Sequence, residues 1–135
     1  MSILDGIAEI LPALLKAFQI GQRVSAYGFD WDQPSGALQK VREELDELEQ
    51  AIQSKKGINL SDEMGDCLFS LVNVSRQLHV NPEIALRQTN DKFIKRFRYI
   101  EDKLREKDRD LEKVSLEEME ALWEESKGKV DSPQK

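Results

Sequence analysis

The sequence predicts an all-α fold of four to five helices, packed as a bundle-like domain. Apolar residues recur at intervals of three and four along most of the chain, which is the period of an amphipathic helix. Asn, Ser, Pro and Gly residues stand at the ends of these segments as start and stop signals. No segment alternates apolar and polar residues as a half-buried strand would. The 135 residues, 39% of them hydrophobic, suffice for a single domain, expected over 1–128 with a disordered tail over 129–135.

The composition excludes several classes of partner. The chain has 20 basic and 26 acidic residues and a net charge of −6, which argues against sequence-independent binding to nucleic acid. No apolar run is long enough to span a bilayer, and the N-terminus lacks a basic start followed by an apolar core. The single cysteine, Cys67, excludes a disulfide framework. We therefore expect a cytoplasmic protein with no nucleic-acid or membrane partner.

The first predicted helix runs from Pro12 to Gly28. Proline suits the first turn of a helix, and glycine suits its end. The residues expected to face the core are Leu14, Leu15, Phe18 and Val24. Residues 29–36 then form a loop, as their Asp, Pro, Ser and Gly content indicates, and this loop carries Phe29 and Trp31.

The second predicted helix, residues 36–55, is amphipathic and strongly acidic. Its inward face is expected to hold Leu38, Val41, Leu45, Leu48 and Ile52. Lys40, Glu44 and Glu47 lie along one flank of that face, and Glu43 adds an acid within the same turn. The helix ends at two cations and a glycine, which suit the negative end of its dipole: Lys55, Lys56 and Gly57.

The third predicted helix begins at a cap on Asn59 or Ser61, ends near His79, and is apolar around most of its circumference. Such a helix is normally buried. Its polar residues form one narrow stripe: Glu63, Asp66, Ser70, Asn73 and Gln77. The stripe is either a solvated edge or the lining of a polar cavity, because buried polar groups need partners. The apolar residues on both sides of the stripe favour the cavity.

Two carboxylate pairs define the candidate chemistry. Glu44 and Glu47 are three residues apart on one helix, and Glu63 and Asp66 have the same spacing on the next. This spacing places both acids of a pair on one face. If the two helices lie side by side, four carboxylates converge and a cation is needed to balance them. Oxygen ligands favour a hard cation such as Mg²⁺ or Mn²⁺.

The fourth predicted helix starts at Asn81-Pro82-Glu83, a strong cap signal, and runs to about Lys107. Its inward residues are expected to be Leu86, Phe93, Phe97, Ile100 and Leu104. Lys92 and Arg96 lie a turn apart on one side of it. They are either a phosphate-binding pair, which suits arginine, or a surface pair with buried stems.

The last predicted helix follows a charged loop at 108–114. Ser115 opens it as a capping box with Glu118. Its apolar face is expected to hold Leu116, Met119, Leu122 and Trp123.

Three segments in order resemble a known family: KVREELDELEQAI, DEMGDCLFSLVNVSRQL and NDKFIKRF. They are similar to the MazG-type all-α nucleoside triphosphate pyrophosphohydrolases, whose hallmark is EExxE followed by ExxD. Here these motifs occupy residues 43–47 and 63–66. The similarity extends from LPALLKA through GFDW to the helix with Trp123. It looks most like the C-terminal half of two-domain members, so the chain is either that half as a fragment or a one-domain relative.

The resemblance implies Mg²⁺-dependent hydrolysis of nucleoside triphosphates to the monophosphate and pyrophosphate, with Mn²⁺ as a substitute ion. It implies metal binding by Glu44, Glu47, Glu63 and Asp66. It implies nucleotide contacts at Lys40, Glu44, Lys92, Arg96 and Trp123, to which the polar stripe adds Asn73. It also implies tight homodimers or higher homo-oligomers and, at family level, housecleaning of aberrant nucleotides. Related two-domain proteins carry a lysine just before ExxD, where this chain has Asn59, so one phosphate contact is expected to be missing or altered.

The reaction expected from these parts is attack of a metal-activated water on the α-phosphorus, with pyrophosphate leaving on the side of Lys92 and Arg96. The general base is either Glu43 or Glu47. The loop aromatics either stack on a nucleobase or close the end of the core.

Two other classes of function compete with this interpretation. A non-catalytic helical module for oligomerisation or nucleotide binding explains the apolar stripe of residues 36–55 equally well. It does not explain a polar stripe on an otherwise apolar helix. A di-iron carboxylate bundle needs Glu-x-x-His on facing helices, and the only histidine, His79, is not in that spacing.

Overall fold

The computed structural model describes residues 1–54 and 59–131, and it is all-α as predicted. The helices are α1 (Ala13–Ser25), α2 (Pro34–Ser54), α3 (Leu60–Gln77), α4 (Pro82–Glu106) and α5 (Leu116–Val130), with a 3₁₀ turn at Leu111–Lys113. No strand occurs within these two described ranges. The predicted stop of the second helix at Lys55, Lys56 and Gly57 lies outside the described residues.

The chain divides into two compact units, Met1–Ala85 and Leu86–Lys135. The boundary falls within the first turns of α4, and each unit is described by itself. The expectation of a single domain over 1–128 stays a prediction. Helix α5 continues to Val130, two residues into the segment expected to be a tail. Among the described helices, none combines the length and apolar content that crossing a bilayer requires.

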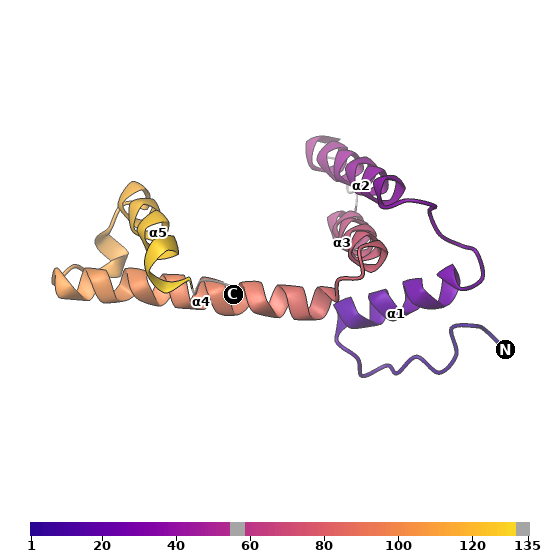
Figure 1. The fold of residues 1–135 in the computed structure, drawn as a ribbon. Helices are drawn as coiled ribbons and strands as arrows, with labels where there is room; N and C mark the ends of the chain where they lie inside the picture. Colours follow the sequence, from indigo (N-terminus) through magenta and orange to yellow (C-terminus); the bar gives the residue numbers. More distant parts are fainter. Residues whose placement is uncertain (55–58, 132–135) are drawn as a thin grey trace. The chain divides into compact units, whose positions relative to one another are not determined.

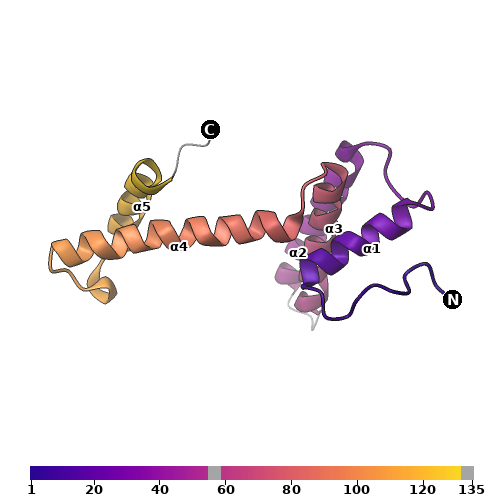
Figure 2. The same cartoon turned by 60° about the horizontal axis from the view of Figure 1, so that its bottom comes forward.

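Helices α2 and α3 lie side by side in the first unit, and α1 packs against α3 (Figures 1 and 2). The buried apolar residues of α2 and α3 are small or β-branched: Ala37, Val41, Ala51, Cys67 and Val72. Helix α1 approaches α3 closely at Gly21. A Cβ there would lie 2.7 Å from Nε of Arg76 and 2.8 Å from Oδ1 of Asn73. This position therefore needs a residue without a side chain.

The predicted helix caps are confirmed at the start of three helices. Asn59 caps α3, because its Oδ1 accepts a hydrogen bond from the backbone N–H of Asp62 at 3.2 Å. Asn81 does the same for α4 and Ser115 for α5. Each cap satisfies a backbone donor that the helix itself leaves unpaired. The start points, and therefore the faces that the helices present, are set locally.

The second unit has its own small core, built from α4, the 3₁₀ turn and α5. Its buried members are Ile100, Leu104, Val114 and Leu122, with Phe97, Leu111, Met119 and Trp123 packed against them. Ile100, Leu104, Leu122 and Trp123 were predicted to face inward. The core forms because α5, after the 3₁₀ turn, comes back over the C-terminal part of α4 and crosses it (Figure 1).

Several residues predicted to face inward are exposed instead. On α2 these are Leu38, Leu45 and Ile52, and elsewhere they are Leu86, Phe93 and Leu116. The nearly all-apolar α3 was expected to be buried, yet Met64, Leu68, Phe69 and Leu71 are exposed by 41–53%. The reason is that, in the part of the chain that the structure describes, α2 and α1 pack on two sides of α3 and leave the rest of its surface uncovered. A helical pattern shows that a face is apolar, but not what covers it.

Candidate functional site

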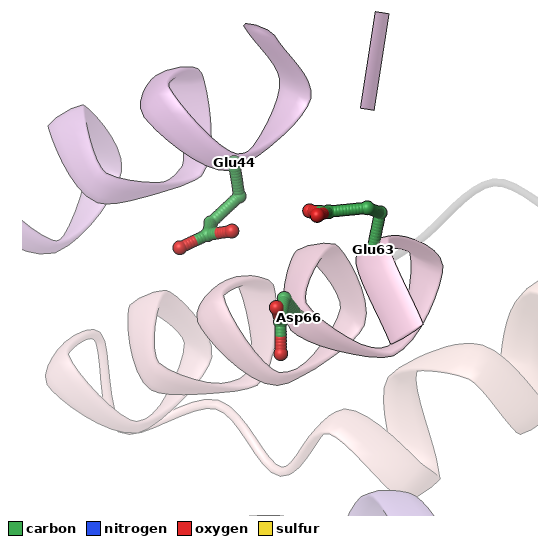
Figure 3. A group of neighbouring side chains, drawn as sticks. All are labelled: Glu44, Glu63 and Asp66. Carbon is green, nitrogen blue, oxygen red and sulfur yellow. The ribbon is translucent and has the colours of Figure 1, made fainter. Parts of the chain in front are cut away.

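Three acidic side chains meet between α2 and α3 in the first unit. Glu44 reaches from α2 toward α3, where Glu63 and Asp66 lie one turn apart (Figure 3). One carboxylate oxygen from each of the three residues lies within 4.8 Å of the others. Glu44 is buried, Glu63 is half-buried and Asp66 is exposed. The cluster is therefore closed on the Glu44 side and open to solvent on the Asp66 side.

The backbone that supports this cluster is built by local signals and one contact between helices. The cap at Asn59 places Glu63 in the first turn of α3, where the helix dipole favours a negative charge. The thiol of Cys67 donates a hydrogen bond to the backbone carbonyl of Glu44 across 3.3 Å. This bond ties the middle of α2 to α3 beside the acids. The sequence did not predict this bond, because no local spacing connects Cys67 to Glu44.

The negative charge of the cluster is only partly balanced. Lys40 Nζ lies 3.1 Å from Oε1 of Glu44, as the spacing along α2 predicts. Within the part of the chain that the structure describes, Oε2 of Glu44 and Oε2 of Glu63 are buried without a hydrogen-bond partner. A buried carboxylate oxygen without a partner is costly. Three oxygen donors arranged in this way could hold a metal ion, and their chemistry suits a hard cation.

Glu47 and Glu43 flank the cluster without belonging to it. Glu47 is exposed and is not part of the three-acid group. The negative charge of Glu44 raises the pKa of Glu47, with smaller effects from burial and from Glu63. The carboxylate of Glu47 is thus close enough for the charges of Glu44 and Glu63 to act on it. Glu43 is 56% exposed, and its carboxylate lies 3.7 Å from Lys40 Nζ.

Asn73 lies further along the polar stripe of α3 and belongs to a different network. Its Oδ1 accepts a hydrogen bond from Nε of Arg76 at 3.3 Å. Arg76 in turn donates from its two terminal nitrogens to Asp30, at 2.9 and 2.6 Å. The hydrogen bond from Arg76 is the main reason that the pKa of Asp30 falls from 3.8 to about 2. Sequence reasoning missed this pair, because no local spacing connects residue 30 to residue 76.

A largely apolar cavity of about 380 Å³ lies between α1, the loop after it and α3. Phe29, Trp31 and Phe69 supply its aromatic surface, and Asn73 and Arg76 supply polar groups. Phe29 is 79% exposed, whereas Trp31 is half-buried and packs against Gly36. The half-buried Trp31 fits the interpretation that a loop aromatic closes the end of the core. Phe29 and Trp31 both line the cavity, so stacking on a nucleobase stays a prediction for either residue.

The basic residues predicted to bind substrate lie in the second unit. The guanidinium of Arg96 lies over the Trp123 ring, 5.2 Å from its centroid. Phe93 supports Trp123 from α4, with ring centroids 5.0 Å apart. Arg96 also binds the carboxylate of Asp131, which follows the last residue of α5. Lys92, one turn before Arg96, is exposed.

Comparison with known proteins identifies the family. Residues 33–100 match the model of the MazG nucleotide pyrophosphohydrolase domain. That segment is half of the chain and contains all three acids of the cluster. The chain belongs to the MazG family. The recognition made from EExxE and ExxD is therefore confirmed.

Two curated relatives extend the match over nearly the whole chain. The nucleoside triphosphate pyrophosphohydrolase/pyrophosphatase MazG of Thermotoga maritima is 42% identical over 122 residues, which are 90% of this chain and 47% of that protein. The nucleoside triphosphate pyrophosphohydrolase of Escherichia coli is 40% identical over 130 residues, or 93% of this chain and 49% of that protein. The chain thus spans about half the length of the relatives it matches.

Proposed function

We propose that this chain carries out Mg²⁺-dependent hydrolysis of nucleoside triphosphates to the monophosphate and pyrophosphate. The observation that carries the proposal is the group of Glu44, Glu63 and Asp66, in which two buried oxygens have no partner among the described residues. Membership in the MazG family supports it, as does the pyrophosphohydrolase activity for which the two relatives are named. Mn²⁺ would serve the same ligands, since both are hard cations that accept carboxylate oxygen.

The metal ligands in this proposal are the three clustered acids together with Glu47. The orphaned oxygens of Glu44 and Glu63 are donors of the kind that such an ion prefers. A bound ion would balance the charge of the triphosphate and lower the pKa of a coordinated water. Glu47 has a side chain long enough to turn toward Glu44, whose charge already acts on it.

The chain's own residues have two further tasks, to accept a proton and to bind phosphate. The attacking water must lose a proton as it approaches the α-phosphorus, and a carboxylate beside the cluster is the natural acceptor. Glu47 fits this task better than Glu43, because Glu43 is directed to solvent and Lys40. Lys92 and Arg96 would bind the leaving pyrophosphate, as planar guanidinium and ammonium groups do.

The cavity along α3 is our candidate for the nucleoside. Asp66 and Asn73 are seven residues apart on α3, which is about 10 Å along a helix at 1.5 Å per residue. A nucleotide bound by its phosphates at the acids could therefore reach the aromatic surface of Phe29 and Trp31. Trp123 remains the alternative contact in the second unit, as the resemblance implies.

Homodimerisation is also part of the proposal. Leu38, Leu45 and Ile52 form an exposed row on α2, and Met64, Leu68 and Leu71 form one on α3. Contiguous apolar rows on a folded domain indicate an interface. A second copy of the chain could cover these rows, because in a symmetric dimer each copy buries its own rows against those of the other. Leu68→Glu should reduce the assembly to monomers in sedimentation experiments, whereas Gln50→Glu, on the exposed surface of α2, should leave it intact.

A substrate panel tests the activity directly. The protein would be incubated with each standard and deoxy nucleoside triphosphate, and pyrophosphate release would be measured with Mg²⁺ and with a chelator. We expect release only with the metal. Release of orthophosphate instead, or equal turnover with the chelator, would reject the proposal.

The matched pair Glu63→Gln and Asp62→Asn tests the site. Glu63→Gln removes one ligand charge, and we expect turnover to fall by about 100-fold or more. Asp62→Asn removes the same charge from the neighbouring exposed residue, and we expect near-normal turnover. Circular dichroism would check that both variants stay helical. Equal effects of the two substitutions would show that the loss reflects net charge rather than the site.

The alternative of a non-catalytic oligomerisation module draws support from the exposed apolar rows. An oligomerisation module does not explain why, among the described residues, one oxygen each of Glu44 and Glu63 is buried without a hydrogen-bond partner. We therefore place it second.

A further inference from the structure

The guanidinium of Arg96 is already occupied by an anion of the chain itself. Its Nε donates to Oδ1 of Asp131 at 3.0 Å, and a terminal nitrogen contacts the second carboxylate oxygen. Two parallel contacts from a guanidinium to two oxygens are the geometry in which arginine also binds phosphate. Asp131 thus uses the same donors that a phosphate group would use.

The surroundings of this pair form an anion site with excess positive charge. Arg96 is only 12% exposed, and Trp123 holds its guanidinium from one face. The hydrogen bond from Arg96 lowers the pKa of Asp131, and the charges of Lys92 and Lys127 lower it further. Lys127 also pairs with Glu124 at 3.0 Å, and the charge of Glu124 acts on Arg96. Three cations and two carboxylates therefore meet here, which leaves a net positive charge. A ligand with several negative charges would satisfy them better than Asp131 does.

Asp131 is also placed where it can leave at little cost. It follows the last residue of α5 in an extended conformation, with φ −72° and ψ 118°. Helix ends fray, and a change of backbone angles there disturbs no interior hydrogen bond. Arg96, in contrast, is in the middle of α4 and rests on Trp123. The pair can therefore open by movement of Asp131 alone.

We propose that Asp131 is an internal competitor for phosphate at Arg96. Its carboxylate holds the guanidinium in place until the polyphosphate group of a nucleotide displaces it. This inference rests on the proposed function only in treating Arg96 as a phosphate-binding residue. As a consequence, the apparent affinity for phosphate equals the intrinsic affinity multiplied by the fraction of molecules in which Asp131 has left Arg96.

The first experiment measures binding of inorganic pyrophosphate to the full chain by calorimetry, in chelator so that metal sites do not contribute. Asp131→Asn and Asp131→Ala should bind pyrophosphate about three- to tenfold more tightly than the unmodified protein. Asp131→Glu keeps the competing charge and should resemble the unmodified protein. The matched control is Asp102→Asn, which removes the same charge from an exposed pair with Arg105 on α4. It should leave the affinity unchanged.

A second measurement observes the exchange of partners. The carboxyl carbon of Asp131 can be titrated by NMR, and its pKa should be below the usual range in the free protein. Saturation with pyrophosphate should return this pKa toward or above the usual value, because Arg96 then has a different partner. In turnover assays, Asp131→Asn should lower KM for the triphosphate and leave kcat near its normal value.

Unchanged or weaker pyrophosphate binding in both Asp131→Asn and Asp131→Ala would overturn the inference, as would a failure of the unmodified protein and both variants to bind pyrophosphate. The inference would also be overturned if saturating pyrophosphate left the pKa of Asp131 unchanged. The failure of the proposed function has a different signature. If no triphosphate is hydrolysed but the Asp131 variants still bind pyrophosphate more tightly, the enzyme assignment is wrong and the competition stands.

Discussion

The two units of the chain each contain a cluster of like charges, and they treat those charges in opposite ways. The acids of the first unit are partly buried. Among residues 1–54 and 59–131, two of their oxygens have no hydrogen-bond partner, and Lys40 is the cation paired with Glu44. The cations of the second unit surround a carboxylate that the chain itself supplies. The charge of the first cluster is therefore mostly uncompensated by the chain, whereas the Arg96 side chain of the second already has a carboxylate partner.

We expect the largest effect from Glu44→Gln, which tests whether the acids of the first unit lack a balancing charge. The substitution removes the buried charge of the cluster, and we expect turnover to fall by about 100-fold or more. Because the orphaned charge is destabilising without a metal, the melting temperature in chelator should rise. Glu49→Gln, on the exposed side of α2, is the control and should change neither quantity. A lower melting temperature for Glu44→Gln would mean that the pair with Lys40 outweighs the repulsion.

Added metal should stabilise the protein through the acids of the first unit and not through the Arg96 site of the second. In the proposed function Mg²⁺ binds the folded cluster and not the unfolded chain, so it should raise the melting temperature of the unmodified protein. At a concentration one hundred times the dissociation constant the gain is about 2.7 kcal/mol. Asp66→Asn should lose most of this shift, whereas Asp131→Asn, in the second unit, should keep it. An equal shift in both variants, measured by differential scanning fluorimetry, would place the metal elsewhere.

The ion pair of Asp30 and Arg76 can be compared with the three clustered acids, because it lies in the same unit and each of its charges has a partner. Asp30→Asn should lower the free energy of unfolding by about 1–2 kcal/mol at neutral pH, a figure reduced for solvent screening. The folded-state pKa is lowered from 3.8 to about 2, so this stability is present above pH 3.8 and is lost as the pH falls toward 2. Urea titrations across that range, with Asp32→Asn as the control, would measure it. A difference that persists at pH 2 would contradict the ion-pair explanation.

The smallest expected effect concerns Glu47. Its pKa is raised in the folded protein, mainly by the charge of Glu44. A raised carboxyl pKa contributes stability below the ordinary value of 4.5, and this stability is lost as the pH rises through the folded pKa. Glu47→Gln should therefore melt at a slightly higher temperature than the unmodified protein at neutral pH in chelator. The two proteins should converge below pH 4.5. A gain that is independent of pH would indicate an effect of shape rather than charge.

Much of the fold was predictable because its signals are local. Asn59, Asn81 and Ser115 cap the helices that they were expected to cap, since a side-chain oxygen needs only the next few backbone donors. The exposed rows on α2 and α3 were not predictable. Periodicity shows that Leu45 and Leu68 share apolar faces, but these faces can be covered by the same chain or by a second one.

The candidate site shows the same division. The spacing along each helix predicted that Glu63 and Asp66 share a face, and the structure brings Glu44 to them. The contributions of Glu47, Lys92 and Trp123 to the site stay predictions. The pairing of Asp30 with Arg76 had no local signal, because a loop and the far end of a helix meet only after the chain has folded.

The helices, the caps of α3, α4 and α5 and the family could all be inferred from the sequence, because helical hydrogen bonds, caps and motifs involve residues a few positions apart. The partners of the charged side chains could not, since they depend on tertiary packing. This packing set Glu44 against two acids of another helix, and it gave Arg96 a carboxylate from the end of α5. The physical reason is that the energy of a charge depends on its burial and on its neighbours in space, and packing decides both.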